Sequence, residues 1–282
     1  MRTDPPSFFY SSPFPPLGIF NWQVDRLNTN AGAWTGGSKV LQTGLVSRTT
    51  SLILGVVLSI VSILYGAATV ERYWYREHGI TLIMALRNPY LIWLHLPTDF
   101  VLIGVSVVAV AFAYSVEPLR LSAQGLGEPC VSYVLTFAAP GVGYVLQGGV
   151  LDRTFLEHIL PLFVINIARM IVMNIPDREG DLKGGKHTSV VMIGEQSAVY
   201  LNSLLYVLVF LYIVPSLPTL SLPVRVCYLA LLPLRWFISL RLHQPEWWTD
   251  IYWRDVLPFY ESLFVLASVL ALNVSLLYDL FM

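Results

Sequence analysis

The sequence predicts an all-α protein, a single bundle of about seven transmembrane helices. Two features of the composition predict this fold class: 55% of the 282 residues are hydrophobic, and only 12% are charged. An average soluble domain carries roughly 25% charged residues, so this chain has too few to cover a water-exposed surface. A mean hydropathy of +0.63 is the third observation and points the same way. The composition therefore argues against a soluble enzyme.

The charge balance excludes a second class of protein. Seventeen Lys and Arg residues stand against 18 Asp and Glu, for a net charge of −1. Nucleic-acid binding needs a strongly basic patch, and the sequence has no Lys/Arg-rich tract. We therefore expect the chain to lie in the lipid bilayer and to bind no nucleic acid.

Seven windows have the length and apolarity of a membrane span. A helix that crosses a hydrocarbon core of about 30 Å needs roughly 20 mostly apolar residues. Windows of this kind, bounded by charge, proline or glycine, cover residues 49–70, 98–116, 129–149, 155–175, 197–214, 219–240 and 256–281. Residues 1–48 hold no such window, so the chain divides into a Pro-rich N-terminal segment (1–48) and one transmembrane domain (49–282).

Residues 81–97 are apolar, but Arg87, Asn88, Pro89, His95 and Pro97 interrupt them. We interpret this stretch as interfacial or re-entrant rather than as a crossing helix. One side of the membrane then receives ten Lys and Arg residues and the other four, with three more inside spans. The positive-inside rule makes the ten-charge side, which also carries most of the acidic residues, the cytoplasmic side.

The strongest chemical signal is IPDREGDLKGGKHT, residues 175–188, at the end of one predicted span. Asp177 and Asp181 are four residues apart, so a helix would place both carboxylates on one face with about 5–6 Å between their Cβ atoms. Carboxylates this close repel each other unless a cation lies between them or one is protonated. Oxygen ligands at this spacing suit Mg²⁺, and Lys183 and Lys186 could bind phosphate oxygens.

An isolated Asp-x-x-x-Asp pair is more often part of a solvated turn. Arg169, eight residues upstream and two turns along the same helix, changes that interpretation. An arginine inside a span almost always faces the bundle interior or an aqueous cavity. We therefore predict that Arg169 joins this motif in one anion-binding site.

Two further polar patches fall on the same predicted side of the membrane. Residues 113–128 contain Tyr114, Ser115 and Arg120, and residues 21–48 contain Asn21 and Asp25, another pair of oxygen-bearing side chains four residues apart. Three such patches on one face favour a shared ligand. The simplest is a diphosphate held through Mg²⁺.

These blocks, in this order, resemble the UbiA superfamily of intramembrane prenyltransferases, and most closely the group that prenylates dihydroxynaphthoate or homogentisate. The resemblance implies a helical bundle in which two Asp-rich motifs bind Mg²⁺ and an isoprenyl diphosphate. The prenyl group would pass to a small aromatic (phenolic) acceptor in quinone or meroterpenoid biosynthesis. The metal ligands would be Asn21, Asp25, Asp177 and Asp181; Asp177, Asp181 and Tyr114 would be catalytic; and Ser115, Arg120, Arg169, Lys183 and Lys186 would bind the diphosphate.

Two departures of the chain from the family concern the first motif and the number of spans. The first motif usually continues to another Asp, where this chain has Asn28 and Thr29. The family has nine spans and its first motif ends the second, whereas here only a Pro-rich stretch precedes Asn21, so the first two helices are expected to be missing.

Three alternatives to an aromatic prenyltransferase stay open at this level. One is a terpene cyclase on the same scaffold, in which the cation is captured by its own double bond. The others are a transporter and an inactive, truncated membrane homologue. Transporters usually place ionisable groups near the bilayer midplane, whereas only Arg169 and Arg235 lie deep in predicted spans.

Overall fold

The structure is a computed structural model that describes residues 47, 49–50, 53–54, 57, 61, 78–88, 90, 98–115, 118–146, 149–216, 222–244 and 251–281. Helices dominate this part of the chain, which confirms the predicted all-α class; an isolated parallel bridge pairs Gln124 with His187. The chain forms two compact units: residues 1–29, 36–121 and 138–151 in the first, and residues 30–35, 122–137 and 152–282 in the second.

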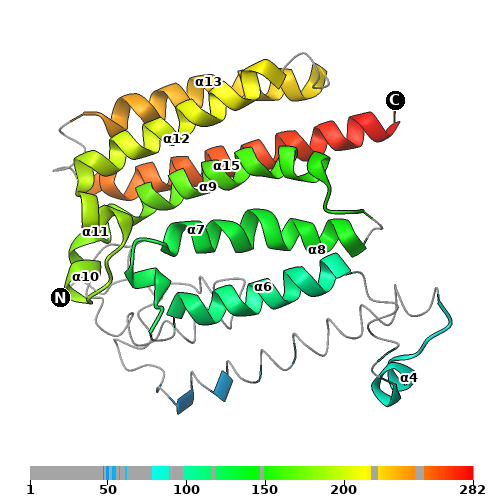
Figure 1. Ribbon diagram of the computed structural model, residues 1–282. Helices are drawn as coiled ribbons and strands as arrows, with labels where there is room; N and C mark the ends of the chain where they lie inside the picture. The colour runs from blue at the N-terminus through cyan, green and yellow to red at the C-terminus, as the bar shows by residue number, and fades with distance from the viewer. Residues whose placement is uncertain are drawn as a thin grey trace. The chain divides into compact units, whose positions relative to one another are not determined.

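The described helices of the first unit are α4 (Leu82–Arg87), α6 (Thr98–Ser115) and α8 (Ala139–Leu146). α6 and α8 pack against each other (Figure 1), and the Leu151 amide donates to Asp99 Oδ2 at 3.2 Å. α4 is a six-residue helix whose N-cap is Thr81, because the Thr81 hydroxyl accepts from the Met84 amide at 3.3 Å. Most of the predicted 49–70 span lies outside the described residues.

The second unit is built around α9 (Arg153–Asn174). It also contains α7 (Gly127–Ser132), α10 (Arg178–Lys183), α11 (Ser189–Ile193), α12 (Glu195–Ser216), α13 (Leu222–Leu242) and α15 (Ile251–Phe281), and a short 3₁₀ turn (Leu121–Ala123) precedes α7 along the chain. α9 packs against α7, α12 and α15, and α13 packs against α15 (Figure 1). The helices enclose a core that includes Ile171, Val172 and Val199 from α9 and α12 and Ile238 and Leu257 from α13 and α15.

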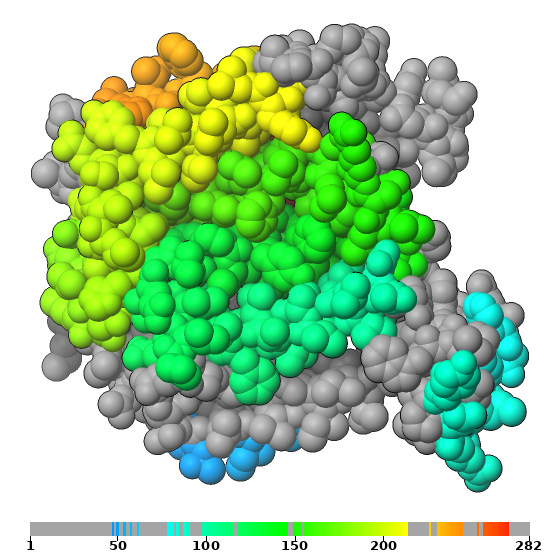
Figure 2. Space-filling view, viewed as in Figure 1, coloured from blue at the N-terminus to red at the C-terminus, as the bar shows by residue number. Residues whose placement is uncertain are grey.

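The outward faces of these helices are apolar as well. On α12, Tyr200, Leu204, Leu208 and Leu211 are exposed, and Figure 2 shows the side chains of α12, in yellow-green to yellow, lying beside those of α9, in green. Residues Phe155–Asn174 and Glu195–Ile213 are long and apolar enough to cross a membrane, with mean hydropathies of 1.7 and 1.6. Apolar side chains on an outer surface match a lipid surrounding, where there is no water to avoid.

Within the described residues, the predicted helices agree with the observed ones except at one place. The windows 98–116, 155–175, 197–214, 219–240 and 256–281 correspond to α6, α9, α12, α13 and α15 within a few residues. The window 129–149 does not form one regular helix, since α7 passes into a π-helical turn, η3 (Tyr133–Ala138), before α8 begins. Wide turns of this kind occur often near functional sites.

Candidate active site

The 175–188 segment folds into a compact turn between α9 and α11. Asp177 is the N-cap residue of α10, and its carbonyl accepts a hydrogen bond from the Asp181 amide at 2.8 Å. The two aspartates are therefore related by one helical turn, as the spacing predicts. The Asp177 carboxylate makes no capping hydrogen bond to α10.

Asp181 is the buried member of the pair, with 2% of its surface exposed. Burial raises the pKa of its carboxyl above the usual value, while the nearby Lys186 ammonium acts in the opposite direction. Oδ1 lies 3.6 Å from Lys186 Nζ, and Oδ2 is buried with no hydrogen-bond partner. A buried carboxylate oxygen in this state costs free energy unless a cation meets it, so Asp181 fits a role as a metal ligand.

Two lysines of the motif have different surroundings. Lys186 pairs with Asp181, and its amide donates to the Asp181 carbonyl at 2.8 Å. That backbone turn depends on Gly185, whose φ of +68° falls in the left-handed region that favours glycine. Lys183 is exposed in the last turn of α10. Lys183 is therefore the more accessible cation of the two for a phosphate group.

Arg169 lies inside the second unit and joins two helices. Its Nε donates to Asn166 Oδ1 at 2.8 Å, and its Nη1 lies 2.9 Å from Met173 Sδ and 3.4 Å from Ser262 Oγ on α15. Asn166, Arg169 and Met173 thus lie on one face of α9, as residues three and four apart on a helix do, whereas Asp177 lies beyond the end of α9. These three partners are neutral side chains, and Glu261 on α15 is the acidic residue that interacts electrostatically with the guanidinium.

Tyr114, Ser115 and Arg120 belong to the first unit, whereas Asp177 and Asp181 belong to the second. Tyr114 is buried near the end of α6, and Ser115 is the last residue of that helix. Arg120 has a φ of +35°, an uncommon conformation for a residue with a side chain. That these three residues share a ligand with the 175–188 segment stays a prediction, and Asn21 and Asp25 lie outside the described residues.

Glu128 is a buried acidic residue that the sequence did not single out as part of the site. It lies in the first turn of α7 with 1% of its surface exposed, and one of its oxygens accepts hydrogen bonds from Asn174 and Ser189. The only signal in the sequence was a carboxylate at the edge of an apolar window, in GLGEPC. A residue of this type is rarely buried unless its charge is paired or hydrogen-bonded.

A second polar cluster, also unpredicted, ties four helices together. Arg235 on α13 forms an ion pair with Glu261 on α15 at 2.5 Å and donates to Asn202 Oδ1 on α12 at 2.8 Å. Asn202 in turn donates to the Ala168 carbonyl of α9 at 2.9 Å, and Tyr206 donates to the other Glu261 oxygen at 2.8 Å. The donors and acceptors of this cluster satisfy one another, as buried polar groups require.

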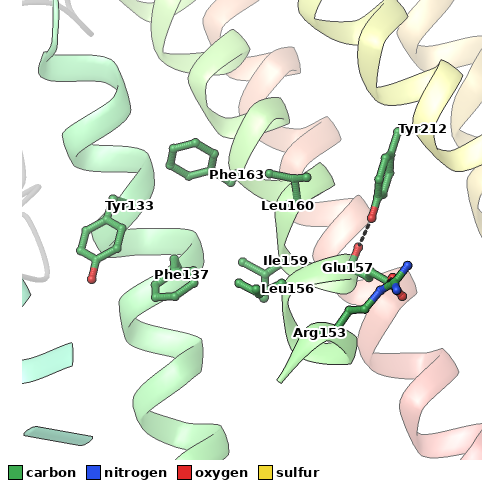
Figure 3. A pocket seen from close by; sticks show the side chains of 9 residues that line it. All are labelled: Tyr133, Phe137, Arg153, Leu156, Glu157, Ile159, Leu160, Phe163 and Tyr212. Atoms are coloured by element: carbon green, nitrogen blue, oxygen red, sulfur yellow. Dashed lines mark hydrogen bonds and ion pairs between the residues drawn. The ribbon is translucent and has the colours of Figure 1, made fainter. Parts of the chain in front are cut away.

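An apolar pocket of about 440 Å³ lies beside the first half of α9 (Figure 3). Tyr133 and Phe137 from η3 face it with their rings stacked at a centroid distance of 5.2 Å, and Tyr212 comes from α12. The exposed pair Arg153–Glu157, at 2.6 Å, lies at its polar edge. The remaining lining residues are apolar and come from α9: Leu156, Ile159, Leu160 and Phe163. Such a lining suits an aliphatic chain.

The number of acidic side chains that lie close together limits how the described residues could bind a metal ion. Among the residues that the structure describes, no group of three or more His, Cys, Asp or Glu side chains gathers in a way that could hold a metal. A pair of aspartates still fits Mg²⁺, which keeps several waters and completes its shell with substrate phosphates. Asp177 and Asp181 are therefore the residues that would hold it in this part of the chain.

Comparison with known proteins gives two kinds of match. A family model described as the UbiA prenyltransferase family matches residues 35–251, which include the motif blocks at 36–48, 114–128 and 177–188. A digeranylgeranylglyceryl phosphate synthase of Thermococcus kodakarensis is 27% identical over 136 residues, covering 48% of this chain and 46% of that protein. A protein of the same name from Pyrococcus abyssi is 30% identical over 124 residues, covering 44% and 40%.

The chain thus spans less than half the length of these curated relatives. No solved structure matches it.

Proposed function

Because the chain belongs to the UbiA prenyltransferase family, whose members are multi-pass helical membrane enzymes, we propose that it transfers an isoprenyl group from an isoprenyl diphosphate to an acceptor. The observation that carries this proposal is the pair Asp177 and Asp181 on one turn at the end of α9, with a buried Asp181 oxygen that lacks a hydrogen-bond partner. Transfer of an isoprenyl group from its diphosphate requires a site that stabilises the negative charge on the leaving diphosphate.

The chain's own residues have separable tasks in this proposal. Asp177 and Asp181 hold Mg²⁺, which supplies positive charge to the leaving diphosphate when it is bound. Lys183 and Arg169 contact anionic oxygens of the substrates; Arg169 lies eight residues before Asp177, about 12 Å along the helix. The apolar walls of the helices keep water from the reactive allylic carbon. Tyr114, Ser115 and Arg120 are assigned to the same site by the family resemblance alone.

The pocket in Figure 3 would receive the far end of the isoprenyl tail. Its α9 residues run from Arg153 to Phe163, whereas the aspartates follow the end of the same helix at Asn174. The distance from Leu160 to Asn174 is about 21 Å along the helix axis. A tail that reaches the pocket therefore has to be several isoprene units long.

For the acceptor we propose a lipid that carries a glyceryl phosphate group. Both relatives are named digeranylgeranylglyceryl phosphate synthases, and 27–30% identity over the matched parts supports a related acceptor. A small phenolic acceptor is the second candidate, since the order and the residues of the 114–128 and 177–188 blocks resemble the enzymes that prenylate dihydroxynaphthoate or homogentisate. The motif loops are proposed to face the cytoplasm.

One assay separates these candidates. The purified protein, with Mg²⁺ and labelled geranylgeranyl diphosphate, is supplied with geranylgeranylglyceryl phosphate, with homogentisate, with dihydroxynaphthoate, or with no acceptor. We expect a labelled lipid product in the first arm that disappears when EDTA removes the metal. Product in the phenolic arms alone supports the second candidate. A cyclic hydrocarbon formed without acceptor contradicts prenyl transfer and supports a terpene cyclase, and no turnover in any arm contradicts an active enzyme.

A further inference from the structure

One carboxylate oxygen contacts both ends of the 175–188 segment. Glu128 Oε1 accepts hydrogen bonds from Asn174 Nδ2 at 2.8 Å, from the Ser189 amide at 3.2 Å and from Ser189 Oγ at 2.6 Å. Asn174 is the last residue of α9, and Ser189 is the first residue of α11. The contacts therefore join the point where the chain enters the motif to the point where it leaves.

The strength of these contacts follows from charge and burial. Hydrogen bonds to an ionised carboxylate are roughly twice as strong as those between neutral groups. Glu128 is almost fully buried, and Asn174 and Ser189 are buried or partly buried, so water competes little for these bonds. α7 also packs against α9, and this packing holds the helix that carries Glu128 in place.

The two short helices at this segment, α10 and α11, depend on their neighbours for orientation, and α11 packs against α9, α10 and α12. α10 has six residues and α11 has five, and isolated helices this short are not stable in water. Their orientation must come from tertiary contacts. The contacts from Glu128 supply one at each end, and the Gln124–His187 bridge adds another beside the second end.

We propose that Glu128 is a positioning residue for the diphosphate site, which it serves by clamping the 175–188 segment so that Asp177, Asp181 and Lys183 keep the arrangement that binds Mg²⁺ and diphosphate. This role rests on the proposed function. In this role Glu128 acts through the hydrogen bonds that its Oε1 accepts, and its Oε2, which is buried with no hydrogen-bond partner, takes no part in the clamp. An amide oxygen at the same place accepts the same bonds, whereas its NH₂ group would repel a cation.

The test compares Glu128→Gln, Glu128→Ala and Ser189→Ala with wild type in detergent. Gln retains the acceptor oxygen, Ala removes it, and Ser189→Ala removes the 2.6 Å bond from the opposite partner. The control is Glu195→Ala, which also removes one carboxylate. Glu195 lies at the partly exposed start of α12 and makes none of the contacts of Glu128. The probe is inorganic pyrophosphate with Mg²⁺, and the readout is the rise in thermal midpoint as pyrophosphate is titrated.

We expect Glu128→Ala to need about 10 to 100 times more pyrophosphate for the same rise in midpoint, as when a group supporting a metal site is removed. Ser189→Ala should shift in the same direction by less, Glu128→Gln should lose much less affinity than Glu128→Ala because its neutral oxygen still accepts weaker bonds, and Glu195→Ala should resemble wild type. In turnover assays Glu128→Ala should raise the KM for the prenyl diphosphate more than it lowers kcat. Ser189→Ala keeps the test available if Glu128→Ala does not fold.

Three results overturn the proposal. Equal pyrophosphate affinity in wild type, Glu128→Ala and Ser189→Ala, whatever their stability without ligand, means that Glu128 supports only the fold. A loss in Glu128→Gln as large as in Glu128→Ala means that the charge of Glu128, as a metal ligand, matters and the clamp does not. Wild-type protein that binds no pyrophosphate with Mg²⁺ overturns the proposed diphosphate site itself, and the positioning role with it. Binding of pyrophosphate without prenyl transfer overturns the proposed function alone.

Discussion

Asp181 is a residue at which burial opposes stability. Its carboxylate is 2% exposed, its pKa is raised by that burial, and its Oδ2 has no hydrogen-bond partner. A carboxyl group whose pKa is higher in the folded state than in the unfolded state destabilises the fold when it is ionised. Residues kept in spite of such a cost are concentrated at functional sites.

The first prediction concerns this carboxylate. Asp181→Asn removes the buried charge, so the thermal midpoint without Mg²⁺ should stay equal to that of wild type or rise, while prenyl transfer should fall by about 100-fold or more because a metal ligand is lost. The measurement is thermal unfolding in EDTA beside a turnover assay in Mg²⁺. Asp177→Asn, at a less buried position, should lose activity without gaining stability. Normal turnover in both variants would place the aspartates in a solvated turn.

The placement of Asp177 and Asp181 one helical turn apart was predictable from the sequence. Residues four apart on a helix lie on the same face whatever the rest of the chain does. The same holds for Asn166, Arg169 and Met173. Glu128 could not be found in this way. Its partners are 46 and 61 residues away along the chain, and no local period connects them.

At the scale of elements, the polar cluster of Arg235, Glu261, Asn202 and Tyr206 joins α9, α12, α13 and α15 within the apolar core. The side chains of Arg235 and Glu261 are 12% and 0% exposed. The Arg235 guanidinium also lies 3.5 Å from the centroid of the Tyr206 ring. Such a buried pair is weak evidence for net stability, but removing one partner leaves an unpaired buried charge.

The second prediction tests this cluster. Arg235→Met leaves the Glu261 charge unpaired and should lower the free energy of unfolding by about 3–5 kcal/mol. The double variant Arg235→Met/Glu261→Gln, which removes both charges and keeps an acceptor for Tyr206, should recover most of that loss. Thermal or denaturant unfolding in detergent measures both. The control is Arg153→Gln, which breaks a pair whose side chains are 91% and 48% exposed and should leave stability unchanged. A double variant as unstable as the single one would contradict the prediction.

The third prediction concerns the pocket between η3, α9 and α12. Leu160→Trp puts a larger side chain into its lining, so we expect kcat/KM to fall by about 10-fold for a long prenyl diphosphate and to change little for a short one. Leu208→Trp, on the exposed face of α12 and outside the lining, is the matched control. An equal effect on long and short donors would show that the tail does not occupy this pocket.

Helix positions follow from hydropathy, because the length of an apolar window is a property of the sequence alone. The one discrepancy among the described spans, at 129–149, lies where a side chain of α9 contacts this stretch. Thr136 donates to the Ser132 carbonyl at 2.6 Å, and Ser132 accepts from Asn166 of α9 at 3.1 Å, within the stretch that passes into the π-helical turn. A hydropathy window does not register an interaction of this kind.

At the scale of the whole molecule, the few charged residues decide the orientation in the membrane. α9 has 22 residues, about 33 Å in length, which is enough to cross the hydrocarbon core. From the distribution of Lys and Arg, the motif end of α9 is predicted to face the cytoplasm. The number of seven membrane spans is a prediction from the sequence.

The fourth prediction tests this orientation. The two native cysteines are first replaced (Cys130→Ala and Cys227→Ala). A single exposed thiol is then introduced before α9 in the chain (Val150→Cys) or after it (Glu179→Cys). In sealed right-side-out vesicles a membrane-impermeant thiol reagent should label Val150→Cys, and in inverted vesicles it should label Glu179→Cys. Labelling in detergent shows that both thiols can react. Labelling of both from one side of the membrane would show that α9 does not cross it.

The all-α membrane class, most described helices and the helical pairing of Asp177 with Asp181 are predictable from the sequence. Each of these depends on composition or on spacing within one helix, and both are local properties. Helix packing is needed to show that Asp181 is the buried carboxylate, that Lys186 is its partner and that Glu128 contacts both ends of the motif. Burial and hydrogen bonding depend on which helices pack together, and the free energy of a buried charge depends on neighbours that are far away in sequence.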